Sequence, residues 1–389
     1  MFADFSTFLM AVVFVAINGI TMIAWGAQMG YKLKPTSFAF FLAGLANALT
    51  GNVVPLSGQS SILTISNYVK NTNERVAALI IATVVMVPLG IFGVVSAVAD
   101  YAGQPVILGM MAGVGLMIST ISVDLARKDI RTGLISIATA LVAWWLFVGN
   151  QYQLVYVIAI SVTVSTLDFL FLQKNKETGR FGRRVNFKNL AKEGGFTGDM
   201  DEDEEYRPWK REYWQGFKIT RPKFGFNALY YSLAFICISI GTIIAFGNIT
   251  AGMAGVENPV DTLTVINGLV DIPTVLFGGM PIEVVISATA NAPWPILAGI
   301  VMMLLVGVLL LFGIVSRIVK YLPAQSIVGF LLVIGFFSTF RPNLVNAFNT
   351  GYTSQASAAL LVTAVTKNPF LGIVAGVLVR YIGSYIGLP

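Results

Sequence analysis

Long apolar runs recur from one end of this chain to the other, and they limit what it can fold into. Each run approaches the ~20 residues that an α-helix needs to cross a hydrocarbon core. Apolar residues make up 56% of the 389 residues and charged residues only 11%, with a mean hydropathy of +0.77. The runs do not alternate apolar and polar residues, as the strands of a membrane barrel would. The sequence therefore predicts an all-α polytopic membrane protein.

The runs form two sets of seven on either side of a polar stretch. We expect a first seven-span repeat at 1–173, a polar connector at 174–227 and a second seven-span repeat at 228–389. The expected spans are 5–27, 36–51, 53–69, 76–99, 105–123, 131–148 and 152–172, then 228–247, 261–277, 281–293, 295–316, 323–339, 354–366 and 369–387. The first run follows Asp4 without a basic segment, so we expect a span and not a removed signal peptide. An odd number of spans per set gives the two sets opposite orientations, as in many secondary transporters.

A short pattern occurs in both halves. GNVVPLSGQSSILT (51–64) and GGMPIEVVISATAN (278–291) each precede a long apolar span. The next span after this long one carries two glycines six residues apart. They are Gly109 and Gly115 in the first half and Gly329 and Gly335 in the second. The pattern predicts about 14 transmembrane segments arranged as two inverted seven-span repeats, with broken third and tenth segments.

Several kinds of chemistry are disfavoured by residue types that the sequence lacks. It has no histidine, and its single cysteine, Cys237, lies in an apolar run. These counts exclude a zinc site of His and Cys ligands and any catalytic pair that needs His. No phosphate-binding GxxxxGK[ST] loop is present either. We therefore expect neither an enzyme nor a bound cofactor.

The basic residues indicate an orientation in the membrane. With fourteen crossings, 23 of the 25 Lys and Arg residues share one side with the connector, leaving only Arg341 and Arg380 on the other. The positive-inside rule makes the side of the connector cytoplasmic. We expect a protein of the cell (inner) membrane with residues 174–227 in the cytoplasm. The mixture of basic and aromatic residues in 206–224 suits lipid headgroups, and we expect no nucleic-acid partner.

The segment FGGMPIEVVISATANAPWP (277–295) places backbone breakers inside the membrane. Pro281 removes a backbone donor, and Gly278 and Gly279 weaken the helix. Backbone groups freed in this way cannot face lipid, so the segment must line a cavity or be buried in protein. We expect a half-helix to restart near Pro281, and another after Pro55, with both N-terminal ends directed toward one point in mid-membrane.

Polar side chains on these segments are the candidate binding residues. On the expected second half-helix, Glu283, Ser287 and Asn291 would share one stripe. The other candidates for substrate binding are Ser57, Gln59, Ser60, Asn18 and Asn248. An ionisable residue in the membrane is costly, so Glu283 is interpreted as a proton carrier or substrate anchor, or as a carboxylate satisfied by a helix N-terminus. Asp271 is the second candidate for ion coupling, whereas Asp168 lies near the connector and is expected to be solvated.

Several of these stretches resemble the xanthine/uracil permease family. NGLVDIPTVLFGGMPIE (267–283) resembles its "DGL-x-T" and "GG-x-P" pattern, and FSTFLMAVVFVAING (5–19) resembles its first span. The resemblance implies seven-plus-seven inverted repeats with core and gate domains, often in a homodimer. The sequence departs from the family pattern. Residues 228–247 lack the usual carboxylate, and the family's tenth-span carboxylate aligns with Ser287, with Glu283 one turn earlier. Family members also usually have cytoplasmic termini and no 54-residue polar insertion between the repeats.

These observations predict a secondary transporter of a nucleobase-like solute of the xanthine, uracil or guanine class. We expect proton or sodium coupling, a surrounding lipid bilayer and a possible homodimer. The alternative is an anion transporter or channel of the sulfate/bicarbonate type, which shares the fold and often lacks those carboxylates.

Overall fold

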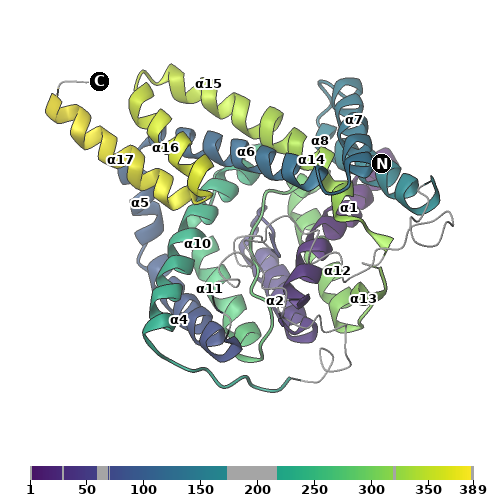
Figure 1. Ribbon diagram of the computed structural model, residues 1–389, viewed down its shortest axis with the longest axis horizontal. Helices are drawn as coiled ribbons and strands as arrows, with labels where there is room; N and C mark the ends of the chain where they lie inside the picture. Colours follow the sequence, from purple (N-terminus) through teal and green to yellow (C-terminus); the bar gives the residue numbers. More distant parts are fainter. Residues whose placement is uncertain are drawn as a thin grey trace.

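The computed structural model describes residues 2–28, 30–58, 69, 71–172, 217–318 and 321–386, and the statements below concern these residues. The chain is almost entirely helical in this part, with two short strands (Figure 1). The first half contains α1 (Phe2–Gln28), α2 (Leu33–Thr50), β1 (Leu56–Ser57), α4 (Thr72–Ile91), α5 (Val94–Ala102), α6 (Gln104–Ala126), α7 (Ile130–Leu146), α8 (Gln153–Leu167) and η1 (Asp168–Leu172). The second half contains α10 (Phe226–Met253), α11 (Val260–Leu276), β2 (Glu283–Val284), η3 (Ala288–Asn291), α12 (Pro295–Leu311), α13 (Val315–Ile318), η5 (Ala324–Ile327), α14 (Val328–Leu332), η6 (Val333–Phe340), α15 (Arg341–Asn349), α16 (Thr353–Thr366) and α17 (Pro369–Ile386).

The helices are long and apolar enough to confirm an integral membrane protein. Six helical segments of the described chain reach spanning length with suitable hydropathy, among them Gln104–Ala126 and Phe226–Met253. The described chain also has the shorter apolar helices Ile130–Leu146, Pro295–Leu311 and Pro369–Tyr385. Most expected spans coincide with a helix to within a few residues.

Two of the longer expected spans differ in detail, whereas the short ones at 53–69 and 281–293 contain the strands β1 and β2. The span expected at 76–99 is divided into α4 and α5, because Gly93 adopts a left-handed conformation (φ 67°) that ends the continuous helix. The span expected at 323–339 begins with a 3-10 turn and continues through a π-helical stretch into α15. Neither difference changes the order of the elements.

The packing of the two halves follows one scheme, as inverted repeats require. In the first half α1 packs against α8 and α12, and in the second α10 packs against α17 and α4. In the same way α2 contacts α12 in the first half, and α11 contacts α4 in the second. Helix α7 contacts α8 and α14, and its counterpart α16 contacts α17 and α6. Each contact has its counterpart when the repeats are exchanged. The predicted fold of two inverted seven-span repeats is therefore confirmed.

The two glycine pairs noticed in the sequence occupy equivalent contacts. A Cβ atom added at Gly109 would lie 2.2 Å from the carbonyl oxygen of Ala356, and one at Gly329 would lie 2.0 Å from that of Ser136. Gly115 and Gly335 face each other, since a Cβ at Gly115 would lie 2.6 Å from the carbonyl oxygen of Gly335. Only glycine permits backbones to approach this closely, a common device in membrane helix packing.

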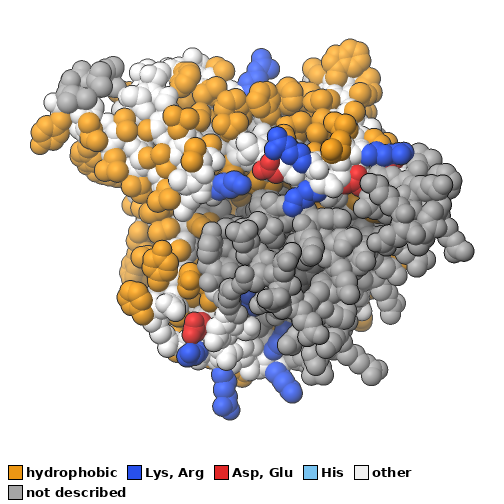
Figure 2. All heavy atoms as spheres, in the orientation of Figure 1, with side chains coloured by type: hydrophobic (Ala, Val, Ile, Leu, Met, Phe, Trp, Pro, Cys, Tyr) orange, Lys and Arg blue, Asp and Glu red, His pale blue; other side chains and the backbone are white. Residues whose placement is uncertain are grey.

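The helices form two layers (Figure 1). The strand layer, lower in the figure, contains α1, α2, α4, α10, α11 and α12 around the two strands. The second layer, across the top, contains α6, α7, α8 and α14 to α17. Hydrophobic side chains cover much of the second layer on the face in Figure 2, whereas Lys and Arg side chains project mainly at the lower edge and beside the undescribed atoms. This distribution suits a body surrounded by lipid.

The end of the connector lies across the strand layer. We call the extended residues 217–224 the strap. The Phe217 ring packs between Phe38 of α2 (4.7 Å between centroids) and Phe277 (5.8 Å). Lys32 donates to the carbonyl oxygen of Lys218 (3.1 Å), and partial burial together with the charge of Lys218 lowers the pKa of Lys32. The expected boundaries at 174 and 227 stay a prediction, because 173–216 lie outside the described residues.

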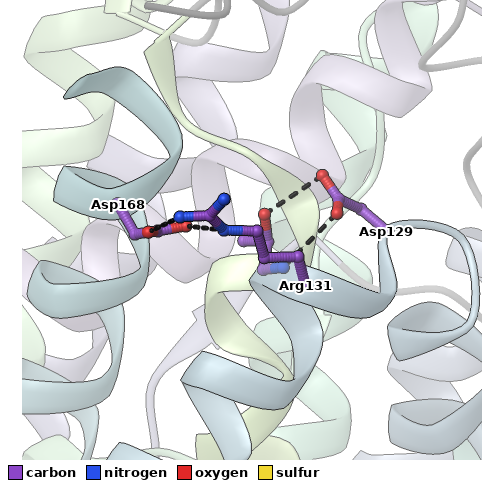
Figure 3. A network of polar contacts seen from close by, with 4 residues as sticks. Asp129, Arg131 and Asp168 are labelled. Carbon is purple, nitrogen blue, oxygen red and sulfur yellow. Dashed lines mark hydrogen bonds and ion pairs between the residues drawn. The ribbon is translucent and has the colours of Figure 1, made fainter. Parts of the chain in front are cut away.

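An ion pair joins α7 to the end of α8 in the second layer (Figure 3). The Arg131 guanidinium donates from Nη2 to Asp168 Oδ1 (2.8 Å) and from Nε to Oδ2 (3.2 Å). Asp129 accepts from the backbone and hydroxyl of Thr132 and so begins α7. Asp168 is only 6% exposed, so the expectation of a solvated carboxylate is wrong. A fork of two hydrogen bonds to arginine satisfies it instead.

Candidate functional site

The two broken segments meet inside the strand layer. Leu56 pairs with Val284, and Ser57 pairs with Glu283, in a short antiparallel sheet. Ser57 and Glu283 each lie two residues after the proline of their own segment, Pro55 and Pro281. The pairing satisfies backbone groups that the prolines and the lost helix would leave free within the membrane. The expected convergence of the two segments agrees with this geometry.

One long helix approaches each strand. Gly19 of α1 lies against Ser57, because a Cβ at Gly19 would lie 2.4 Å from Ser57 Oγ. Ser239 of α10 donates to Glu283 Oε1 at 2.6 Å, and both residues are fully buried. This length is at the short end of the usual range for a hydrogen bond from a hydroxyl to an oxygen. Ser239 of α10 thus holds Glu283. The Ser57 hydroxyl lies in the space that a side chain at position 19 of α1 would occupy.

The half-helix expected after Pro281 is not present. Glu283 and Val284 are extended, Ser287 is also extended (φ −135°), and only the four-residue 3-10 turn η3 follows. Pairing with β1 and the β-branched residues Ile282, Val284 and Val285 favour an extended chain over a helix. Glu283, Ser287 and Asn291 therefore do not share a helical stripe, and the expected dipole of a half-helix is missing on this side.

Ser287 and Asn291 lie at the two ends of η3. The Ser287 hydroxyl caps this turn by accepting from the Thr289 amide (3.2 Å) and bonds to the Thr289 hydroxyl (2.7 Å). Asn291 Oδ1 is buried and has no hydrogen-bond partner among the described residues. Because η3 packs against α1, α10 and α12 of its own layer and α8 of the second layer, this turn lies where the layers meet.

A polar side chain from the preceding helix holds each broken segment. Asn47 of α2 donates to the carbonyl oxygen of Val54 (2.8 Å), next to Pro55. Asp271 of α11 accepts from the Ile282 amide (2.9 Å), next to Pro281. Both side chains are buried, so these bonds fix the backbone on either side of the strand pair. In this structure Asp271 supports the site from behind the strand.

The remaining candidates have different positions. Asn18 is partly buried on α1, one residue before Gly19, the residue that lies against Ser57. Asn248 instead accepts from Asn258 (3.0 Å) and lines a recess of about 610 Å³ formed by α5, α6, α10 and the start of α11. Asn248 is therefore separate from the strand pair. Gln59 and Ser60 lie outside the described residues.

Two buried polar atoms of this region have no hydrogen-bond partner among the described residues. Ser57 Oγ is buried and, like Asn291 Oδ1, lacks a partner among the described residues. A buried polar atom without a partner costs ~1–3 kcal/mol, so such atoms are rare unless a ligand or water completes them. The region can offer hydroxyl and amide groups together with the carboxylate of Glu283.

Three residues of the site escaped the sequence analysis: Ser239, Gly19 and Asn47. Ser239 lies in an apolar run without a carboxylate, and one hydroxyl in such a run does not by itself indicate a site. Gly19 would have been a candidate because a glycine inside a long apolar helix often marks close approach. Asn47 lies eight residues before Pro55, a spacing that signals nothing by itself.

Comparison with known proteins identifies the fold. The transmembrane domain of a cyanobacterium bicarbonate transporter, BicA, matches this chain with a TM-score of 0.52 and 12% sequence identity, over 97% of this chain and 98% of that chain. At this identity the likeness shows the fold alone. No protein-family model and no curated protein sequence matches the chain. The resemblance to the xanthine/uracil permeases therefore stays a prediction.

Proposed function

We propose that this protein is a secondary active transporter whose substrate binds beside the β1–β2 pair. The observation that carries the proposal is the meeting of two interrupted segments, from opposite repeats, at Ser57 and Glu283. Irregular backbone at membrane depth is tolerated where it is buried or lines a cavity, and transporters use it to form midplane sites. A protein that served only as a scaffold would not need matched breaks.

The arrangement of layers supports alternating access. The strand layer carries the site, and η3 reaches α8 of the second layer. The tight contact of Gly115 with Gly335 joins the two repeats within the second layer. Rocking of one layer against the other would expose η3 and the strand pair first to one side of the membrane and then to the other.

The fold likeness favours an anion as the substrate. The matching solved structure is named as a bicarbonate transporter domain. In such a carrier the hydroxyl of Ser57 and the polar groups near η3 would donate hydrogen bonds to the anion. The carboxylate of Glu283 would oppose anion binding, so a coupled cation would have to supply positive charge nearby.

The local chemistry favours a second candidate, a neutral planar solute such as a nucleobase. Such a ring presents N–H donors and carbonyl acceptors, which match the carboxylate of Glu283, the hydroxyl of Ser57 and the amide of Asn291. Glu283 would then accept ring N–H bonds or carry the coupled proton. The missing half-helix dipole after Ser287 weakens the anion candidate on this side of the site.

Uptake into proteoliposomes separates these candidates. The purified protein would be tested with labelled bicarbonate, sulfate, xanthine, uracil and guanine under imposed proton and sodium gradients. We expect accumulation of one class only, driven by one of the two gradients. Absence of uptake of every compound under both gradients would contradict the proposed function.

A substitution beside the strand pair tests the location of the site. Gly19→Ala would displace the Ser57 hydroxyl, because the added methyl would lie 2.4 Å from it. We expect a raised KM for the accumulated substrate. The control is Gly252→Ala near the end of α10, where a Cβ meets nothing within 4 Å. Equal KM values for the two variants would place the site elsewhere.

A further inference from the structure

Helix α11 carries two buried polar side chains on one face, behind the strand that bears Glu283. Asn267 and Asp271 lie four residues apart, the spacing at which helix side chains are neighbours. Their exposed fractions are 1% and 0%. Both positions face the protein interior within a membrane-spanning helix, where a polar group needs a specific reason.

Asp271 uses only one of its two oxygens. Oδ1 accepts from the Ile282 amide, whereas Oδ2 has no hydrogen-bond partner among the described residues. The ion pairs of this part of the chain join Arg127, Arg131 and Lys223 to other carboxylates and do not include Asp271. A carboxylate buried in this way requires either a proton or a bound cation.

Asn267 is the second buried side chain of α11 with polar atoms that lack partners among the described residues. Neither its Nδ2 nor its Oδ1 atom has a partner within the described residues, although the side chain is buried. A buried amide with all its hydrogen-bonding capacity unused is exceptional in a folded protein. Its oxygen and Asp271 Oδ2 together supply a carboxylate and an amide oxygen on one face of α11.

We infer that Asp271 Oδ2 and Asn267 Oδ1 form a buried binding site for a small monovalent cation such as sodium. Hard cations bind carboxylate and amide oxygens, which are the two groups offered here. A single positive charge neutralises Asp271. The cation gives a reason for two partnerless groups that packing alone does not explain.

The site is linked to the proposed substrate site through the backbone. Asp271 holds the Ile282 amide, and Ile282 immediately precedes Glu283 in the strand pair. A cation at Asp271 would therefore fix the strand that bears Glu283. This role in transport depends on the proposed function, whereas cation binding itself does not.

Thermal unfolding of the purified protein tests the binding directly, without any substrate. Unfolding would be followed in sodium chloride and in choline chloride at equal ionic strength. A ligand that binds only the folded protein raises the Tm, and at tenfold excess over its Kd we expect a rise of roughly 2 °C in sodium. Equal Tm values of the parent protein in the two salts would overturn the inference.

Two variants assign the effect to these residues. Asp271→Asn keeps an acceptor for the Ile282 amide, and Asn267→Leu removes the partnerless amide. Both should unfold at the same temperature in the two salts, and Asn267→Leu should exceed the parent in choline, because the unsatisfied amide is removed. Glu257→Gln, in an exposed loop, should keep the full sodium effect. A sodium effect that persists in both α11 variants would place the cation elsewhere.

The outcome is independent of the uptake assays. Sodium stabilisation that requires Asp271 and Asn267, combined with no uptake of any substrate, would leave the cation site standing and remove the proposed function. Uptake of a substrate without such stabilisation would leave the proposed function standing and remove the cation site.

Discussion

Ser57 and Glu283 lie directly opposite each other in the strand pair, each two residues after the proline of its own repeat. The two positions are therefore equivalent in the repeats, yet one is a hydroxyl beside Gly19 and the other a carboxylate bonded to Ser239. This chemical difference at equivalent positions gives the proposed site its polarity. The predictions below begin from it.

Glu283→Gln separates the two candidate substrates. The change keeps the shape of the side chain and removes its charge and its proton. For a proton-coupled nucleobase carrier we expect loss of proton-driven accumulation with some exchange remaining, because the amide still forms hydrogen bonds. For an anion transporter a repulsive charge disappears, so uptake should stay equal or become faster. Normal proton-driven accumulation of a nucleobase by the variant would remove Glu283 from the coupling mechanism.

Ser239→Ala should destabilise the protein through Glu283. It removes a buried donor 2.6 Å from Oε1, and the loss of a donor to a buried acceptor costs ~1–3 kcal/mol. Unfolding in detergent measures the loss. In a Glu283→Gln background the same change should cost less, and this difference is the coupling between the two side chains. Ser232→Ala on the same helix is the control, because among the described residues its hydroxyl bonds to its own helix. An equal loss in both variants would contradict the assignment.

Gly115→Ala should disturb the contact between the repeats in the second layer. The new methyl would lie 2.4 Å from the Phe340 amide nitrogen and 2.6 Å from the Gly335 carbonyl oxygen, and backbone atoms cannot move aside cheaply. Overpacking of this kind costs ~1–3 kcal/mol. We expect a lower free energy of unfolding for Gly115→Ala and none of this loss for Gly252→Ala. Unchanged stability of Gly115→Ala would show that the layer tolerates wider spacing there.

Arg131→Ala should lower the Tm because it removes the two hydrogen bonds that the guanidinium donates to the buried carboxylate of Asp168. Arg127→Ala is a matched control, since Arg127 forms an exposed pair with Asp124 one turn away, and such pairs contribute little. We also expect the double change Arg131→Ala/Asp168→Asn to restore part of the lost Tm. Equal Tm values for the Arg131 and Arg127 variants would show that the Arg131–Asp168 ion pair does not stabilise the protein.

The orientation in the membrane is tested with single cysteines in a Cys237→Ala background. Lys218 lies in the strap and Glu257 in the loop after α10, at opposite ends of that 28-residue helix, and both are exposed. We expect an impermeant maleimide to label Glu257→Cys in intact cells and Lys218→Cys only after permeabilisation. The reverse pattern would place the connector outside and both termini in the cytoplasm.

The sequence by itself determined the class of protein and the positions of the breaks. Apolar runs near 20 residues must be spans whatever surrounds them, since the bilayer imposes their length. Pro55 and Pro281 interrupt helices by local sterics, and the glycine pairs at equal spacing revealed the repeat. These signals act within a few residues, so they can be read from the chain alone.

Only the tertiary structure decided what the broken segments do. The half-helix expected after Pro281 became a strand because β1, more than 200 residues earlier in the chain, supplies its hydrogen-bond partners. The hydrogen bonds from Ser239 to Glu283, 44 residues apart, and from the Ile282 amide to Asp271, 11 residues apart, depend on the same packing and were likewise not visible in the sequence. Conformation after a proline depends on which neighbour satisfies the backbone, and in a membrane that neighbour must be protein.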